Sequence, residues 1–99
     1  MNDNLEQLAH ELLSCYEEAY NIYSIEVNRI ITNKITDNNY IELTLDYILS
    51  IYTEKGFYLF IKLLSYYQTI NEDKARYYLN LLQEDREEEY HDFVKKLRR

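Results

Sequence analysis

Glycine and proline, the two residues that most often form turns, are nearly absent from this chain. Its 99 residues include no proline and one glycine, Gly56. Strand-rich folds usually need both residues at their turns, whereas helices can begin and end at Asn, Asp, Ser and Thr. The composition therefore favours an all-α fold.

Apolar residues recur every three or four positions from about residue 5 to about residue 31, which is typical of one face of an amphipathic helix. A helix of that length would be roughly 40 Å long, which is long for so small a domain. We therefore expect either a break near residues 21–24 or an end that projects and finds a partner. The apolar face consists of Leu5, Leu8, Leu12, Cys15, Tyr16, Ala19, Tyr23, Val27 and Ile30.

The segment after Thr69 also has a helical pattern. Thr69 and Glu72 have the spacing of a capping box, and Asn71 is an alternative N-cap. The polar run at residues 84–89 either continues one long helix or turns a corner. The expected buried face consists of Ala75, Tyr78, Leu79 and Leu82.

Residues 40–64 allow two interpretations. Residues 41–47 alternate between apolar and polar as a half-buried strand would, and Glu54-Lys55-Gly56 could close a hairpin. Alternatively, Gly56 could be a helix C-cap, with a helical spacing on both sides of it. We favour the helices, and so a single domain over residues 1–99. It would be a small four-helix bundle-like domain with long first and last helices. The alternative is an α+β fold with a central hairpin between two helices.

The residues that could support catalysis or bind a cofactor are few. A single glycine excludes the phosphate-binding loops of nucleotide-dependent proteins. Cys15 lies on the apolar face of the first segment, so we expect it to be a small buried hydrophobic residue. Cys15, His10 and His91 are too few for a structural zinc site. We therefore expect no enzyme activity, no cofactor and no metal.

The formal net charge of −7 bears on location and partners. Such a charge repels nucleic acid and anionic lipids and attracts basic proteins. The most apolar stretch, residues 47–67, is interrupted by Glu54, Lys55 and Lys62, so we expect no membrane span. The chain starts without a signal-like segment and has one cysteine, which indicates a cytoplasmic protein.

One acidic run with neighbouring tyrosines is the candidate partner-binding surface. Such a run is usually a solvated helix face. Its functional interpretation is a surface that imitates a phosphate backbone and occupies a basic groove on another protein. The residues are Glu84, Asp85, Glu87, Glu88, Glu89, Tyr77, Tyr78 and Tyr90.

These observations predict a non-catalytic protein-binding domain that inhibits or masks a basic, nucleic-acid-handling partner. Inhibitors, antitoxins, immunity proteins and phage anti-defence proteins act in this way. One alternative is a helical assembly module that forms a homo-oligomer or a small subunit of a larger complex. Another is a small helix-turn-helix DNA-binding regulator that uses the basic tail Lys95, Lys96, Arg98 and Arg99.

Overall fold

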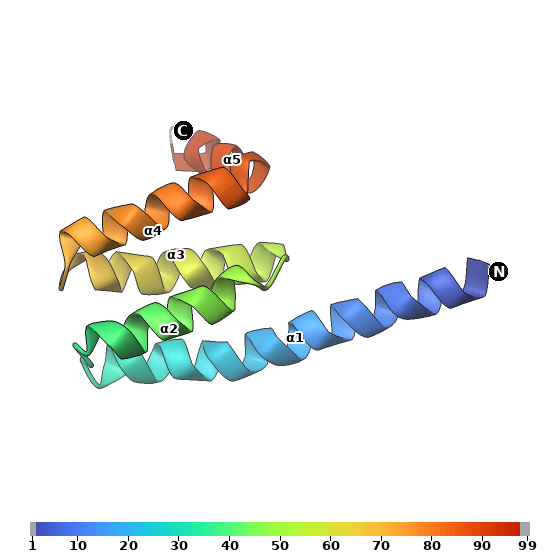
Figure 1. Cartoon of the computed structure of the whole chain (residues 1–99), viewed down its shortest axis with the longest axis horizontal. Helices are drawn as coiled ribbons and strands as arrows, with labels where there is room; N and C mark the ends of the chain where they lie inside the picture. Colours follow the sequence, from blue (N-terminus) through green and yellow to red (C-terminus); the bar gives the residue numbers. More distant parts are fainter. Residues whose placement is uncertain (1, 98–99) are drawn as a thin grey trace.

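The computed structural model describes the backbone of residues 2–97 and the side chains of residues 5–88, 90–92 and 94–96. The described backbone is helical with short connections and contains no strand, so the all-α prediction is confirmed and the central hairpin is not formed. Figure 1 shows α2 and α3 beside one end of α1, α4 on the other side of α3, and α5 at the end of α4. The helices are α1 (Asn2–Thr32), α2 (Asn38–Leu49), α3 (Glu54–Gln68), α4 (Glu72–Asp85) and α5 (Glu87–Leu97).

The first helix is continuous, so the break considered near residues 21–24 does not occur. Its 31 residues correspond to about 46 Å. The 12, 15 and 14 residues of α2, α3 and α4 correspond to only about 18–23 Å. The bundle therefore covers one end of α1, and the other end extends away from it, as Figure 1 shows.

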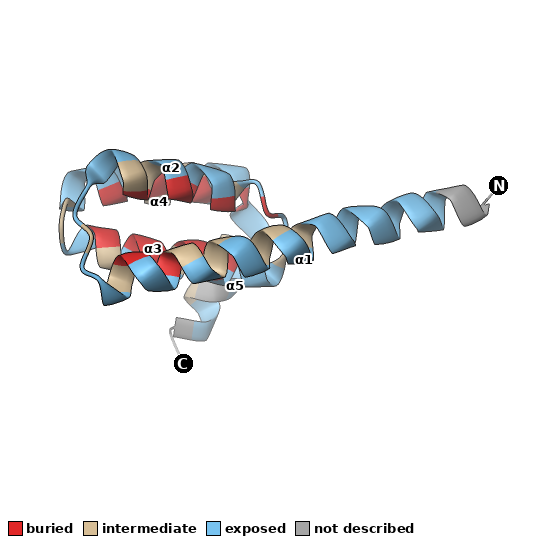
Figure 2. Cartoon of the chain, turned by 90° about the horizontal axis from the view of Figure 1, so that it is seen from below, coloured by how far each residue is buried: buried red, intermediate tan, exposed pale blue. Residues whose placement is uncertain are grey.

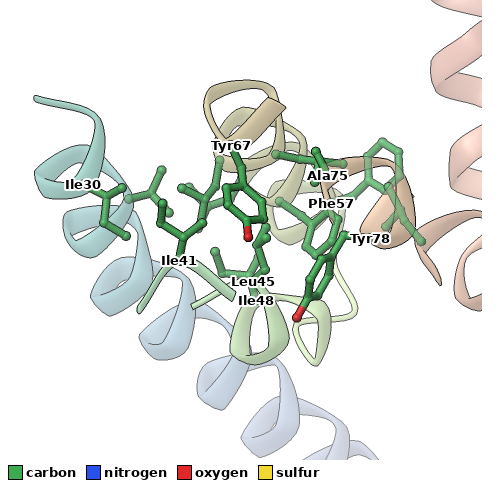
Figure 3. Packing of buried hydrophobic residues seen from close by; sticks show 14 residues of the cluster. Ile30, Ile41, Leu45, Ile48, Phe57, Tyr67, Ala75 and Tyr78 are labelled. Atoms are coloured by element: carbon green, nitrogen blue, oxygen red, sulfur yellow. The ribbon is translucent and has the colours of Figure 1, made fainter. Parts of the chain in front are cut away.

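The core lies between α3 and the three helices that pack against it, which are α1, α2 and α4. Figure 3 shows Ile30 from α1, Ile41 from α2, Tyr67 from α3 and Tyr78 from α4 within one buried cluster. These large side chains are buried because each comes from the apolar face of its own helix. The buried cluster contains Val27, Ile30, Ile41, Leu45, Ile48, Phe57, Leu59, Phe60, Leu63, Leu64, Tyr67, Ala75, Tyr78 and Leu82.

Short polar side chains begin the helices, as expected for a chain that lacks proline. Asp37, Thr53 and Asn71 are the N-caps of α2, α3 and α4, and each accepts a hydrogen bond from a backbone N–H of the first turn. The cap predicted at Asn71 is thus confirmed. The capping box predicted at Thr69 is wrong, because Thr69 is the C-cap of α3.

Gly56 lies in the first turn of α3, where its N–H donates to the Thr53 hydroxyl over 3.1 Å. It belongs neither to a hairpin nor to a helix C-terminus, so both predicted roles are wrong. A Cβ atom at this position would lie 2.5 Å from the carbonyl oxygen of Ile51. The α2–α3 connection therefore crosses α3 too closely for any larger residue.

The last helical segment turns at Arg86, so the predicted long last helix is two helices, α4 and α5. The Arg86 side chain is 3% exposed. Its guanidinium donates to the carbonyl oxygens of Ile51 and Thr53 and lies 4.8 Å from the ring centroid of Tyr52. Since these contacts pull the side chain under the α2–α3 connection, they explain why the helix does not continue straight.

Candidate protein-binding surfaces

Residues 5–22 of α1, here called the arm, extend beyond the bundle. Every side chain from residue 5 to residue 15 is exposed, and only Tyr16, Ala19 and Tyr20 are half-buried. Figure 2 shows this end of α1 almost entirely in the colour of exposed residues. The 18 residues of the arm correspond to about 27 Å of helix.

One side of the arm is apolar and faces solvent. Leu5, Leu8, Leu12, Cys15, Ala19 and Ile22 follow one another at alternating intervals of three and four residues, which keeps them on one face. Leu5 is 70%, Leu8 60%, Leu12 52% and Ile22 59% exposed, and the adjacent Leu13 is 55% exposed. Because single exposed apolar residues are common but a continuous apolar face is not, this surface needs an explanation.

The position of this face bears on two expectations. The alternative in which one end of the first helix projects is confirmed, with Leu5, Leu8 and Leu12 exposed, whereas the prediction of a buried Cys15 is wrong, because Cys15 is exposed as well. The physical reason is length, since the other helices are too short to reach this part of α1.

The arm is also uniformly acidic. Residues 1–22 contain five of the eighteen acidic residues of the chain and none of its eleven lysines and arginines. They carry −5 of the net charge of −7, so the rest of the chain is close to neutral. Glu11 and Glu18 each lie one helical turn from Cys15, so they border the apolar face.

Polar contacts fix the direction in which the arm leaves the bundle. The Tyr40 hydroxyl of α2 donates to the Glu26 carboxylate of α1. The Lys62 ammonium of α3 donates to the Asn28 side chain of α1 over 2.8 Å. The end of α1 next to the arm is thus held from two sides, and the arm continues it without a break.

A hollow of about 390 Å³ lies where the arm meets the bundle. Leu13, Tyr16 and Tyr20 line it from the arm, and Thr53 and Lys55 line it from the start of α3. The Lys55 ammonium lies 5.7 Å from the ring centroid of Tyr20. The recess therefore lies beside the apolar face of the arm, on the side of Leu13 and Tyr16, and is large enough for a side chain of another molecule.

The acidic run predicted as a contact surface forms the corner between α4 and α5. Glu84, Asp85, Glu87 and Glu88 are exposed there, whereas the side chain of Glu89 lies outside the described residues. Asp85 accepts a hydrogen bond from the Tyr52 hydroxyl over 3.4 Å, and Glu87 pairs with His91 over 3.7 Å.

The three tyrosines assigned to this surface lie in different environments. Tyr77 is 60% exposed and Tyr90 is half-buried, but Tyr78 is 5% exposed and packs against Phe60 in the core. Burial, reinforced by the neighbouring Asp46 carboxylate, raises the pKa of Tyr78. Tyr78 is therefore a core residue, and only Tyr77 and Tyr90 can accompany the acidic corner on the surface.

Within the described part of the chain, no three His, Cys, Asp or Glu side chains come close enough to hold a metal ion. No helix over the same residues is long and apolar enough to cross a membrane. The chain matches no protein-family model, no curated protein and no solved structure. The arm and the acidic corner therefore carry the functional argument.

Proposed function

We propose that this protein is a non-catalytic protein-binding domain that docks on another protein through the apolar face of the arm. The observation that carries the proposal is the exposure of Leu5, Leu8, Leu12, Leu13 and Ile22, each by more than half, on a helix segment outside the bundle. It acts by occupying a surface of its partner, as inhibitors, antitoxins, immunity proteins and anti-defence proteins do.

The energy available from this face supports the proposal. Complete burial of a leucine or isoleucine side chain is worth about 1.5–3 kcal/mol. With 52–70% of each of the five side chains still exposed, a partner that covers the face would gain roughly 4–9 kcal/mol before the cost of association. An isolated helix as short as the arm is only marginally stable in water, so the same contact would also stabilise the helix.

The acidic corner supports a second contact surface. Arg86 holds the corner in place by donating to two backbone carbonyls of the α2–α3 connection. The carboxylates of Glu84, Asp85 and Glu88 are exposed to solvent. A rigid group of exposed carboxylates suits electrostatic contact with a basic protein surface.

Capture from native, nuclease-treated cell lysate tests the proposal with three forms of the tagged full-length chain. They are the wild type, the double variant Leu8→Asp/Leu12→Asp, and the control Leu43→Asp. Leu43 is 55% exposed but lies on α2, which packs against the other end of α1. We expect mass spectrometry to find a protein that the wild type and the control retain and the double variant loses. If all three forms retain the same proteins, the arm is not the docking surface.

Reversing Glu87, Glu88 and Glu89 to lysine tests the acidic corner in the same experiment. If the corner contributes, the captured protein is lost although the far-UV circular dichroism spectrum is unchanged. Unchanged capture would remove the corner from the proposal and leave the arm in it.

A further inference from the structure

We infer that the partner of the arm is a protein with an apolar groove bordered by lysine and arginine, and not a second copy of this chain. The inference rests on the proposed function and names the chemistry of the partner. Three properties of the arm carry it: the width of its apolar face, the area of that face, and its charge.

Together with the adjacent Leu13 and Tyr16, the apolar face is too wide for a single helix to cover. Leu8 and Leu13 lie about 140° apart around the helix axis, with Leu12 and Tyr16 between them. A two-helix seam needs only a narrow apolar stripe, whereas a face wider than 100° is typical of helices that pack into a core. In this structure the other end of α1 is covered by two helices, α2 and α3. A groove between two helices of the partner would cover the arm in the same way.

The area that two arms could bury together is small. At about 25 cal/mol per Å², the burial energies of Leu and Ile correspond to roughly 60–120 Å² of apolar surface per side chain. Five side chains that are 52–70% exposed then offer about 200–350 Å² per arm, or at most roughly 700 Å² for a pair. Specific interfaces bury about 1,200–2,000 Å² in total, somewhat more than half of it apolar. A pair of arms reaches only the lower end of that range, whereas a groove adds the area of both its walls.

Charge decides between the two occupants. A second arm would bring four more carboxylates and no lysine or arginine to a face that Glu11 and Glu18 already border. Salt screens charges only in part when they lie closer together than about 8–10 Å. Each like-charge contact costs a few tenths of a kcal/mol, whereas lysine or arginine at the same place gains about as much and speeds the encounter. The charge of the arm therefore favours a groove bordered by lysine or arginine and disfavours pairing with a second arm.

Two synthetic helical hairpins provide the probes for the test. Both present the same leucine-lined groove between their helices, and the groove is bordered by lysine in one hairpin and by glutamate in the other. Binding of each labelled hairpin to the full-length chain is measured by fluorescence anisotropy at low and at high salt. Sedimentation equilibrium of the chain alone measures its self-association.

We expect the lysine hairpin to bind at least about tenfold more tightly than the glutamate hairpin, with a difference that shrinks at high salt. We expect Leu8→Asp/Leu12→Asp to abolish this binding and Leu43→Asp to leave it unchanged. The variant Glu11→Gln/Glu18→Gln should weaken it several-fold and reduce its salt dependence. The chain alone should sediment as a monomer.

Three results would overturn the inference. A dimer of the chain alone that resists salt and is broken by Leu8→Asp/Leu12→Asp would make the second copy the occupant. Equal binding of both hairpins would show that the arm does not select a groove with a basic border. Binding of neither hairpin, together with arm-dependent capture from lysate, would assign the arm a partner of another chemistry while the proposed function stands. Only the loss of arm dependence in the lysate capture would reject the proposed function itself.

Discussion

Replacing Gly56 by alanine should destabilise the protein, although the same change inside most helices is stabilising. A glycine in a helix interior costs about 0.5–1 kcal/mol relative to alanine. In α3, however, the added Cβ would lie 2.5 Å from the carbonyl oxygen of Ile51, and 2.7 and 2.8 Å from its Cγ2 and Cβ atoms. These atoms belong to the backbone and to the base of a branched side chain, so they cannot turn away.

The magnitude follows from what the Ile51 carbonyl already holds. It accepts hydrogen bonds from the Thr53 N–H, over 2.9 Å, and from the buried guanidinium of Arg86. Overpacking costs about 1–3 kcal/mol, and a weakened hydrogen bond to a charged group adds to this. After the gain in helix propensity is subtracted, we expect a net loss of about 1–3 kcal/mol, or a Tm lower by roughly 5–20 °C for a domain of this size.

Urea unfolding followed by far-UV circular dichroism measures this change. The matched control is Ser65→Ala, at an exposed position of the same helix, which should raise the free energy of unfolding by up to about 0.5 kcal/mol. A Gly56→Ala variant as stable as the wild type would refute the close contact between the α2–α3 connection and α3. A double-mutant cycle with Arg86→Met should show a smaller loss than the sum of the two single changes, because the displaced carbonyl then has no guanidinium to hold.

Three other measurements address α2, the core and the arm. Asp37→Ala removes the N-cap of α2 and should lower the free energy of unfolding by about 1 kcal/mol; no change in a urea titration would contradict that role. Burial and then the Glu42 carboxylate raise the pKa of Tyr67 above its ordinary value of 10.0. Its contribution to stability is therefore complete below that pH and is lost as pH rises through the folded-state pKa. The wild type should lose stability above pH 10.0 more steeply than Tyr67→Phe, and parallel curves would reject this assignment. Amide hydrogen exchange at residues 5–15 should be much faster than in α3, because every side chain in that range is exposed; equal protection would indicate that the arm is covered in solution.

Local signals were sufficient to predict the helical fold. The apolar spacing marks α1 and α4 directly, and Asn71 has the chemistry of an N-cap and acts as one. The choice between strand and helix for residues 40–64 needed a second signal, because strand-like alternation and helical spacing overlap in a short apolar run. The scarcity of glycine and proline decided it correctly, because Asp37 and Thr53 can begin helices without them.

Contacts between residues far apart in the chain were beyond prediction. Arg86 donates to a backbone carbonyl 35 residues away. No local pattern indicates that this side chain is buried while the acidic side chains around it are exposed. Likewise, the close approach at Gly56 depends on where the α2–α3 connection crosses α3. Helical periodicity shows which residues share a face and not what covers that face, so Leu8 and Leu12 could not be assigned to solvent before the other helices were placed. The acid-only composition of the arm was the available signal that this end of α1 differs from the rest.

The continuity of α1 has a consequence for how the position of a partner can change. The arm and the core-facing end of α1 share one helical phase, and the fully buried residues of α1 begin only at Val27. One residue inserted between Asn21 and Tyr23 would rotate the arm's apolar face by about 100° and advance it by about 1.5 Å, without altering Val27 or Ile30. Seven inserted residues would nearly restore the direction of the face and lengthen the reach by about 10 Å. The angle and distance at which a partner sits against the bundle are therefore set by a count of residues in a single helix.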